Sequence, residues 1–170
     1  IDGGISHDVL NVGKDEVIDF LKCVLRNVAE IFPFPYIHLG GDECPTEQWA
    51  TNEDCLRRVQ EEGLAGVHEL QSWLVEELGA YLKTLNKGIV VWDEVLKNWN
   101  TKNKIEPVIM AWNGGGAVYA KQAADLGFNS ILCPYSHVYI DFMQVPENQL
   151  LVDEPYCGGW GVNTLDRVYS

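Results

Sequence analysis

The sequence predicts an α/β fold in which short parallel strands alternate with helices. Four apolar segments suited to strands, at residues 36–39, 89–92, 108–112 and 129–133, are separated by stretches with helical periodicity. Strand-sized segments that alternate with helices indicate βα units and a parallel sheet. Residues 89–92 are apolar throughout, as in strands that are buried on both faces of such a sheet. We therefore expect about four βα units within a single domain.

Residues 14–31 are expected to form the first helix. Acidic Asp15 and Glu16 lie in its first turn, where the helix dipole favours negative charge, and Pro33 and Pro35 end it. Apolar side chains recur at spacings of three and four residues and form one face, made of Val17, Phe20, Leu21, Val24, Leu25 and Val28.

Two helices are expected between the first and second strands, at residues 53–61 and 66–86. Gly88, which follows Asn86 and Lys87, ends the helix at residues 66–86, because glycine adopts positive φ without strain. A further helix is expected at residues 117–126, where Gly127 ends it. The longer helix, 66–86, carries an apolar side made of Val67, Leu70, Leu74, Leu78, Tyr81, Leu82 and Leu85.

The remaining segments carry weaker signals. Residues 1–13 are rich in glycine and aperiodic, which indicates a loop. Residues 135–141 alternate in character, and we count Tyr139 and Asp141 as belonging to the end of a further strand. The tail, residues 142–170, has no clear element beyond a turn at its paired glycines, Gly158 and Gly159.

The composition restricts the possible functions. The chain has 170 residues, a net charge of −13 and 46% hydrophobic residues, which fits one globular unit whose acidic surface repels nucleic acids. No apolar segment approaches the roughly 20 residues of a membrane-spanning helix. Six tryptophans are many for this length, and they could form either a large core or platforms for sugar rings. The chain starts at Ile1 without a signal peptide, so we expect a processed or partial chain.

The five cysteines form no CxxC pair, which argues against zinc-ribbon and redox sites. Cys44 and Cys55 could pair across the loop that separates them. The odd number leaves at least one free thiol unless a cysteine pairs with another chain. The redox state of the compartment stays open.

A pair of adjacent carboxylates, Asp42 and Glu43, follows the first expected strand in the sequence YIHLGGDEC. Gly40 and Gly41 precede the pair and allow the backbone to turn sharply. Carboxylates held at the end of a strand are suited to acid–base chemistry. The alternative is a solvated acidic turn. His38 lies within the strand, so we expect a buried, hydrogen-bonded histidine rather than a catalytic base.

Polar and aromatic side chains follow four of the expected strands. In a parallel sheet these strand ends lie on one side, where barrels of this type build their active sites. We therefore predict one site that combines them, although each aromatic could also be a core residue. The candidates are Asp42 and Glu43; Trp92 with Asp93 and Glu94; Trp112; and Tyr139 with Asp141.

Four motifs in this order, HLGGDE, VVWDE, VIMAW and VYID, resemble the family 20 glycoside hydrolases, the β-N-acetylhexosaminidases. The resemblance extends from Leu10 to Tyr169. It implies a (β/α)₈ TIM barrel, of which this chain would supply about four βα units that resemble strands four to seven. Because a whole barrel takes about 250 residues, residues 1–170 are expected to be a partial catalytic domain without a second domain.

The resemblance implies removal of terminal N-acetylglucosamine or N-acetylgalactosamine from the non-reducing end of glycans, with retention and without a metal or cofactor. The substrate's own 2-acetamido oxygen would attack the anomeric carbon. Glu43 would protonate the leaving oxygen and later activate water, and Asp42 would orient the acetamide. An extracytoplasmic location also follows from the resemblance alone.

The same resemblance assigns the remaining candidates. Tyr139 would donate its hydroxyl to the acetamide oxygen, Trp92 and Trp112 would wall the acetamide pocket, and Asp141 would accept hydrogen bonds from sugar hydroxyls. Asp93 and Glu94, which lie beside Trp92, are expected to support the rim of the site without contacting the sugar.

Several features qualify these expectations. The family's sugar-binding arginine and its closing tryptophan and glutamate have no counterpart here, so we expect weak or no activity from this chain alone. Its exposed sheet edges are expected to promote homo-oligomers. A non-catalytic carbohydrate-binding fragment is the alternative. The GGDE sequence also resembles the GGDEF loop of diguanylate cyclases, but Cys44 replaces the phenylalanine.

Overall fold

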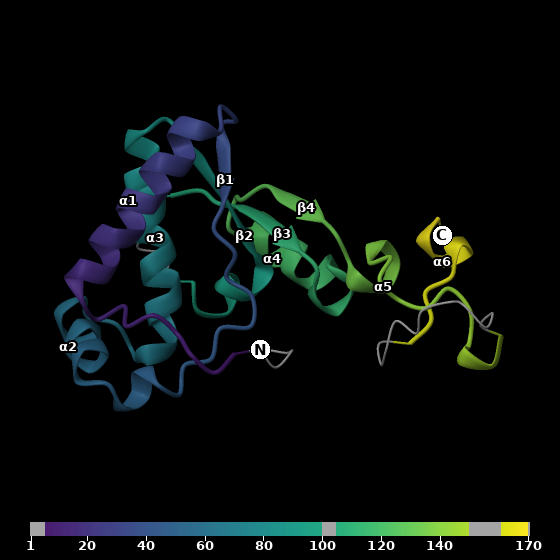
Figure 1. Cartoon of the computed structure of the whole chain (residues 1–170), viewed down its shortest axis with the longest axis horizontal. Coiled ribbons are helices and arrows are strands. Elements are labelled where there is room, and N and C mark those ends of the chain that lie inside the picture. Colours follow the sequence, from purple (N-terminus) through teal and green to yellow (C-terminus); the bar gives the residue numbers. More distant parts are fainter. Residues whose placement is uncertain (1–5, 100–104, 150–160, 170) are drawn as a thin grey trace.

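The computed structural model describes residues 6–99, 105–149 and 161–169. Its centre is a four-stranded sheet whose neighbouring strands are all parallel and follow one another in chain order (Figure 1). The predicted α/β class and parallel sheet are therefore confirmed. The strands are β1 (Tyr36–His38), β2 (Gly88–Trp92), β3 (Val108–Ala111) and β4 (Ser130–Leu132).

The principal helices also lie where the periodicity places them. They are α1 (Asp15–Ile31), α2 (Glu53–Glu61), α3 (Leu70–Thr84) and α4 (Ala117–Asp125). Helix α2 begins after Asn52, whose side chain accepts a hydrogen bond from the backbone N–H of Cys55 and so caps the helix. Helix α4 ends before Gly127, which has a φ of +82°.

Two predicted elements differ from the observed ones. The expected helix at residues 66–86 begins as a 3₁₀ turn, Val67–Glu69. The Glu69 carboxylate accepts a hydrogen bond from the Ala65 N–H, and this bond holds the turn against the residues that precede it. The expected strand ending at Tyr139 and Asp141 is wrong. Pro134 instead starts a short helix, α5 (Tyr135–Val138), and β4 is the last strand of the described sheet.

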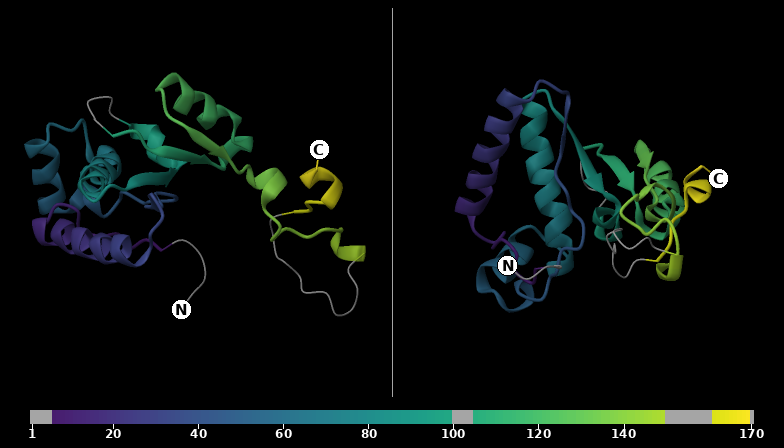
Figure 2. Two further views of the ribbon diagram at one scale, coloured as in Figure 1. Left: turned by 90° about the horizontal axis from the view of Figure 1, so that it is seen from above. Right: turned by 45° about the vertical axis from the view of Figure 1, so that its right-hand side comes forward.

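The C-terminal part extends away from the helices of the N-terminal half. Both views of Figure 2 show α5 and α6 (Leu165–Val168) beyond the β4 edge of the sheet, away from α1 and α3. This part therefore reaches the carboxyl ends of the strands from the β4 side. The predicted turn at Gly158 and Gly159 lies outside the described residues.

The main core lies on one face of the sheet. Alternate strand residues are buried there against Val75 and Leu82 of α3 and Ala123 of α4, namely Ile37, Ile89, Val91 and Ile109. The opposite face carries Val90 and Met110, which are only partly buried. Burial on both faces, expected for residues 89–92, is therefore wrong for the described chain, because its helices pack on one face only.

Apolar side chains on α1 and at the start of β1 are exposed. Phe20 on α1 is 61% exposed, Phe34 in the following turn is 72% exposed, and Tyr36 at the start of β1 is 52% exposed. The apolar stripe predicted on α1 is thus only partly covered, although Leu25 and Val28 pack against the core. Uncovered apolar side chains therefore lie on α1 and at the start of an edge strand.

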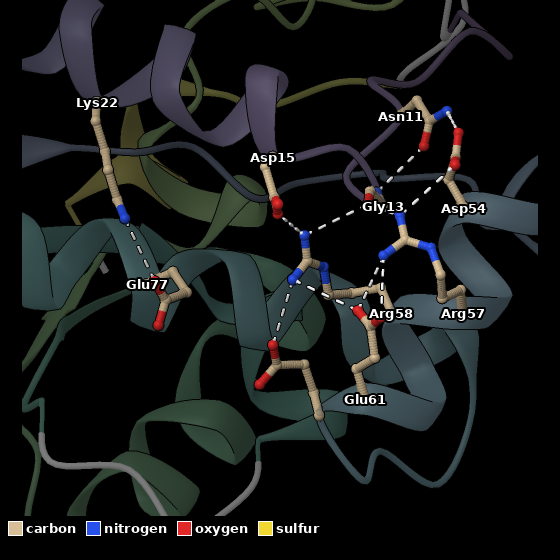
Figure 3. Close-up of polar contacts among 10 residues, drawn as sticks. Asn11, Gly13, Asp15, Lys22, Asp54, Arg57, Arg58, Glu61 and Glu77 are labelled. Atoms are coloured by element: carbon tan, nitrogen blue, oxygen red, sulfur yellow. Dashed lines mark hydrogen bonds and ion pairs between the residues drawn. The ribbon is translucent and has the colours of Figure 1, made fainter.

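The N-terminal segment is fixed to α2 by a polar network (Figure 3). The Gly13 carbonyl accepts hydrogen bonds from Arg57 and Arg58, and Arg58 also forms an ion pair with Asp15. Gly13 packs so closely that a Cβ atom there would lie 2.2 Å from the carbonyl carbon of Asp54. This network holds the segment against α2, so that the backbone carbonyl of Leu10 can accept a hydrogen bond from a buried tryptophan, Trp49.

No disulfide joins Cys44 to Cys55; both are free thiols, so the pairing that the sequence allowed is not formed. Cys55 is fully buried at the start of α2, where its thiol donates to the Asn11 side chain at 3.4 Å. Burial raises the pKa of both thiols. Cys157 lies outside the described residues. Among the helices described, none is long and apolar enough to cross a membrane.

Glu76 on α3 gives a testable pH dependence of stability. Its Oε1 is buried without a hydrogen bond in the described structure, and burial, with Glu77 and Glu69 nearby, raises its pKa from 4.5 to about 8. Between these values the unfolded chain releases the proton that the folded chain keeps, so stability falls as pH rises. We expect the melting temperature to decrease from pH 5 to pH 8, and Glu76→Gln to flatten that decrease.

The matched control for this prediction is Glu106→Gln, which removes a carboxylate at an exposed position. It should leave the slope of melting temperature against pH as it is in the wild type. Equal slopes for Glu76→Gln and the wild type would contradict the assignment.

Candidate active site

The loop after β1 folds over the end of β2. The backbone N–H of Trp92 donates to the Gly40 carbonyl at 2.9 Å, and the Gln71 side chain donates to the Gly41 carbonyl at 2.9 Å. Gly41 has a φ of +102°, and a Cβ atom there would lie 2.4 Å from a methyl group of Val95. Only glycine fits this turn, which directs the chain toward the carboxyl end of the sheet.

The carboxylate pair lies directly after this turn, with both side chains exposed. Glu43 has a φ of +48°, a left-handed conformation that is uncommon for a residue with a side chain. Residues held in such conformations concentrate at functional sites, where their surroundings compensate the strain. The backbone of Glu43 is thus held in an unfavourable conformation at the position where its carboxylate meets the pocket.

A pocket of about 560 Å³ opens beside this pair. All six residues predicted for catalysis and substrate binding line it. They come from the end of β2 and from the segments after β1, β3 and β4. Two further residues, Tyr135 and Phe142, also line it and were missed by the sequence analysis. The lining residues are Asp42, Glu43, Trp92, Trp112, Tyr135, Tyr139, Asp141 and Phe142.

Aromatic rings form the wall of the pocket on the β3–β4 side. The rings of Trp112 and Tyr139 are stacked, with centroids 6.1 Å apart and planes 12° from parallel. Tyr135 meets Trp112 at an angle of 68° and stacks on Phe142. This continuous aromatic surface is suited to the apolar faces and methyl groups of a sugar derivative.

The hydroxyl of Tyr139 is a hydrogen-bond donor at neutral pH. Burial raises its pKa, and the acidic groups of Cys133, Asp141, Asp42 and Asp93 raise it further. A protonated phenol that points into a pocket can donate to a ligand's carbonyl oxygen.

Asp93 and Glu94 are buried beneath the rim and are not among the pocket-lining residues. Asp93 accepts hydrogen bonds from the backbone N–H groups of Trp112 at 2.8 Å and Asn113 at 2.9 Å, and from the Asn113 side chain at 3.1 Å. These contacts fix the turn after β3 and therefore the position of Trp112. Asp93 therefore supports the rim, and the absence of any contact between this acidic pair and a sugar stays a prediction.

His38 differs from its prediction in one respect. Its Nδ1 accepts a hydrogen bond from the Gly40 N–H at 2.9 Å, as expected for a hydrogen-bonded histidine, but its side chain is exposed rather than buried. The reason is that His38 faces the uncovered side of the sheet, where it contacts Trp92 with ring centroids 4.9 Å apart. His38 helps to shape the glycine turn and is not among the residues that line the pocket.

No arginine is among the described residues that line the pocket; Arg26, Arg57 and Arg58 lie on α1 and α2, and Arg167 on α6. Within the described ranges, no group of three or more His, Cys, Asp or Glu side chains is arranged to hold a metal ion. The pocket therefore offers three carboxylates, two phenols and aromatic walls. Acid–base chemistry on a neutral ring-shaped ligand is what this set can support.

Carboxylates and aromatic walls at the carboxyl ends of consecutive parallel βα units are typical of glycoside hydrolases with a (β/α)₈ barrel. Sequence comparison gives the particular family. Residues 1–169 match the profile described as glycosyl hydrolase family 20, catalytic domain. The chain belongs to this family, and its four parallel strands are part of that family's TIM barrel.

Individual relatives agree with this assignment. The chain is 33% identical over 168 residues to the β-hexosaminidase of Porphyromonas gingivalis, covering 98% of this chain and 20% of the relative. It is 35% identical over 164 residues to the β-hexosaminidase of Vibrio furnissii, covering 96% of this chain and 26% of the relative. The chain thus spans about a fifth to a quarter of the length of these curated relatives.

Solved structures show the same similarity. The exo-β-N-acetylglucosaminidase of Vibrio harveyi, solved in complex with N-acetylglucosamine, superposes with a TM-score of 0.80 at 28% identity, over 95% of this chain and 24% of that one. The β-N-acetylhexosaminidase of Bacteroides fragilis gives 0.72 at 28% identity, over 85% and 29%. The resemblance of the GGDE sequence to diguanylate cyclases is therefore incidental.

Proposed function

We propose that the protein to which this chain belongs is a β-N-acetylhexosaminidase that removes terminal N-acetylglucosamine or N-acetylgalactosamine from glycans. The observation that carries the proposal is the pocket in which Asp42 and Glu43 meet Trp92, Trp112 and Tyr139. Family membership and the names of the relatives support the same reaction and favour a hydrolase over a non-catalytic sugar-binding fragment.

The spacing of the carboxylates favours a substrate-assisted mechanism. Retaining enzymes with a carboxylate nucleophile place two carboxyl groups about 5–5.5 Å apart on either side of the bond. Asp42 and Glu43 are adjacent in one loop and are poorly placed to flank a glycosidic bond. In our proposal the substrate's acetamido oxygen attacks the anomeric carbon, and Glu43 transfers its proton to the leaving oxygen. Glu43 then removes a proton from the water that opens the oxazolinium-like intermediate.

The other pocket residues would hold the acetamido group and the sugar. Asp42 accepts a hydrogen bond from the acetamide N–H as positive charge develops on the acetamide. Tyr139 donates a hydrogen bond from its hydroxyl to the acetamide oxygen. Trp92 and Trp112 pack against the acetamide methyl group and exclude water from the reaction. Asp141, exposed at the pocket edge, accepts hydrogen bonds from sugar hydroxyls.

A direct test is hydrolysis of a chromogenic β-N-acetylglucosaminide by the full-length protein. We expect release of the chromophore, with the β configuration retained in the first product observed by NMR. The proposal would be contradicted if neither this substrate nor the matching β-N-acetylgalactosaminide were hydrolysed. Release of the α anomer would contradict the retaining mechanism.

We also propose that the 170-residue chain, when isolated, associates with a second copy of itself. β1 and β4 are the outer strands of the described sheet, and Ile131 and Leu132 on β4 are 46% and 62% exposed. Unpaired edges and uncovered apolar faces promote pairing with another chain. A two-fold dimer that covers these surfaces is the simplest arrangement.

Light scattering at micromolar concentration tests this association. We expect a dimer or larger species with absent or very weak hexosaminidase activity, because the pocket contains no arginine among its described residues. Ile131→Lys should weaken the association if β4 forms the interface. A stable monomer with strong turnover would contradict both parts of the proposal.

A further inference from the structure

Glu94 connects two parts of the pocket that belong to different strands. Its side chain is only 8% exposed, and it follows β2, between the loop after β1 and the turn after β3. One carboxylate oxygen, Oε2, accepts a hydrogen bond from the indole Nε1–H of Trp112 at 2.9 Å. The other, Oε1, accepts one from the backbone N–H of Glu43 at 3.4 Å.

The contact to Glu43 has particular weight because few other contacts could fix this residue. The preceding residues are held by other partners: Trp92 binds the Gly40 carbonyl and Gln71 binds the Gly41 carbonyl. Glu43 itself is exposed, has a φ of +48°, and borders on its other side a second cavity of about 340 Å³ that Glu94 also lines. Its position therefore depends on hydrogen bonding rather than on close packing.

The contact to Trp112 restrains the opposite wall. Asp93 already holds the backbone of Trp112, but the indole could still rotate about its side-chain bonds. The bond from Nε1 to Glu94 fixes the ring plane, which in turn stacks on Tyr139. Hydrogen bonds to a carboxylate are stronger than those between neutral groups, so a buried carboxylate is an effective anchor for both donors.

We propose that Glu94 is a positioning residue that sets the distance between the general acid, Glu43, and the aromatic wall formed by Trp112. This assignment rests on the proposed hydrolase function. Glu94 does not contact the substrate. Its carboxylate offers an acceptor to each of two N–H donors, so the acid and the wall move together with β2. Misplacement of a reacting group by about 1 Å can lower a rate by roughly 100-fold.

Glu94→Gln is the informative substitution because it keeps the size of the side chain. Glutamine has one acceptor oxygen and one NH₂ group, so it can satisfy only one of the two donors and places N–H groups against the other. Glu47→Gln is the matched control, because Glu47 is exposed in the same loop and is not among the pocket-lining residues.

The kinetic test uses the full-length protein and two substrates, an N-acetylglucosamine disaccharide and an aryl N-acetylglucosaminide with an activated leaving group. Hydrolysis of the disaccharide depends strongly on the general acid, whereas hydrolysis of the aryl substrate depends on it little. For Glu94→Gln we expect kcat to fall by about 100-fold on the disaccharide and by about 10-fold on the aryl substrate, with little change in KM. Unchanged kcat on the disaccharide, or an equal loss on both substrates, would overturn the proposal.

A spectroscopic test does not depend on activity. In ¹H–¹⁵N spectra, the indole N–H of Trp112, assigned through its loss in Trp112→Phe, should be protected from solvent exchange. In Glu94→Leu this signal should shift and exchange faster, whereas Glu47→Gln should leave it unchanged. An unprotected indole in the wild type would overturn the role of Glu94. An inactive wild-type protein with a protected indole would contradict the proposed function and leave the structural role standing.

Discussion

Replacing Glu43 with glutamine should lower kcat on a natural N-acetylglucosamine disaccharide by roughly 10²–10⁴-fold, the usual contribution of a general acid. The sugar leaving group of a disaccharide is a poor one and must be protonated as the bond breaks. Glutamine keeps the shape of the side chain and the backbone bond to Glu94 but has no proton to transfer. The measurement is steady-state kinetics of the full-length protein.

Two comparisons make this test specific to Glu43. Glu47→Gln, an exposed acid in the same loop, should retain wild-type kcat. Glu43→Gln should slow the first step less on an aryl substrate with an activated leaving group, because this leaving group departs without full protonation. If Glu43→Gln keeps the wild-type kcat on the disaccharide, Glu43 is not the general acid.

The sequence predicted those parts of the fold and site that depend on local chemistry. The helix at 53–61 and the sharp turn at Gly40 and Gly41 were both predicted. The structure shows that Asn52 caps this helix and that the turn leaves no room for a Cβ atom on Gly41. The six pocket residues were found because they follow consecutive strands or carry family motifs, and parallel strands bring their carboxyl ends together.

The parts that the sequence did not predict depend on tertiary packing. Tyr135 and Phe142 reach the pocket because Pro134 starts a helix where a strand was expected, and this changes which side chains point inward. The exposure of His38 depends on which face of the sheet the helices cover, and the apolar pattern of a parallel strand does not encode this. The double contact of Glu94 joins residues 51 and 18 positions away, a distance over which no local signal operates.

Removing the 2-acetamido group from the substrate should have the other large effect. In the proposed mechanism this group is the nucleophile, and it is held by Asp42 and Tyr139 against Trp92 and Trp112. Intramolecular nucleophiles that are well oriented act with effective concentrations of about 10⁵–10⁸ M, so no external group replaces them. We expect aryl β-N-acetylglucosaminides to be hydrolysed at least about 10³-fold faster than the matching β-glucosides.

A thiazoline mimic of the oxazolinium intermediate separates nucleophilic participation from simple recognition of the acetamide. The mimic should inhibit the wild-type protein strongly. Asp42→Asn should both weaken this inhibition and lower kcat, because Asp42 stabilises the same positive charge in the intermediate and in its mimic. If the acetamide served only for recognition, glucosides would bind weakly but turn over at a similar kcat, and the thiazoline would inhibit no better than N-acetylglucosamine. Equal kcat values on the two substrate classes would therefore exclude the substrate-assisted mechanism, even if Glu43 proved to be the general acid.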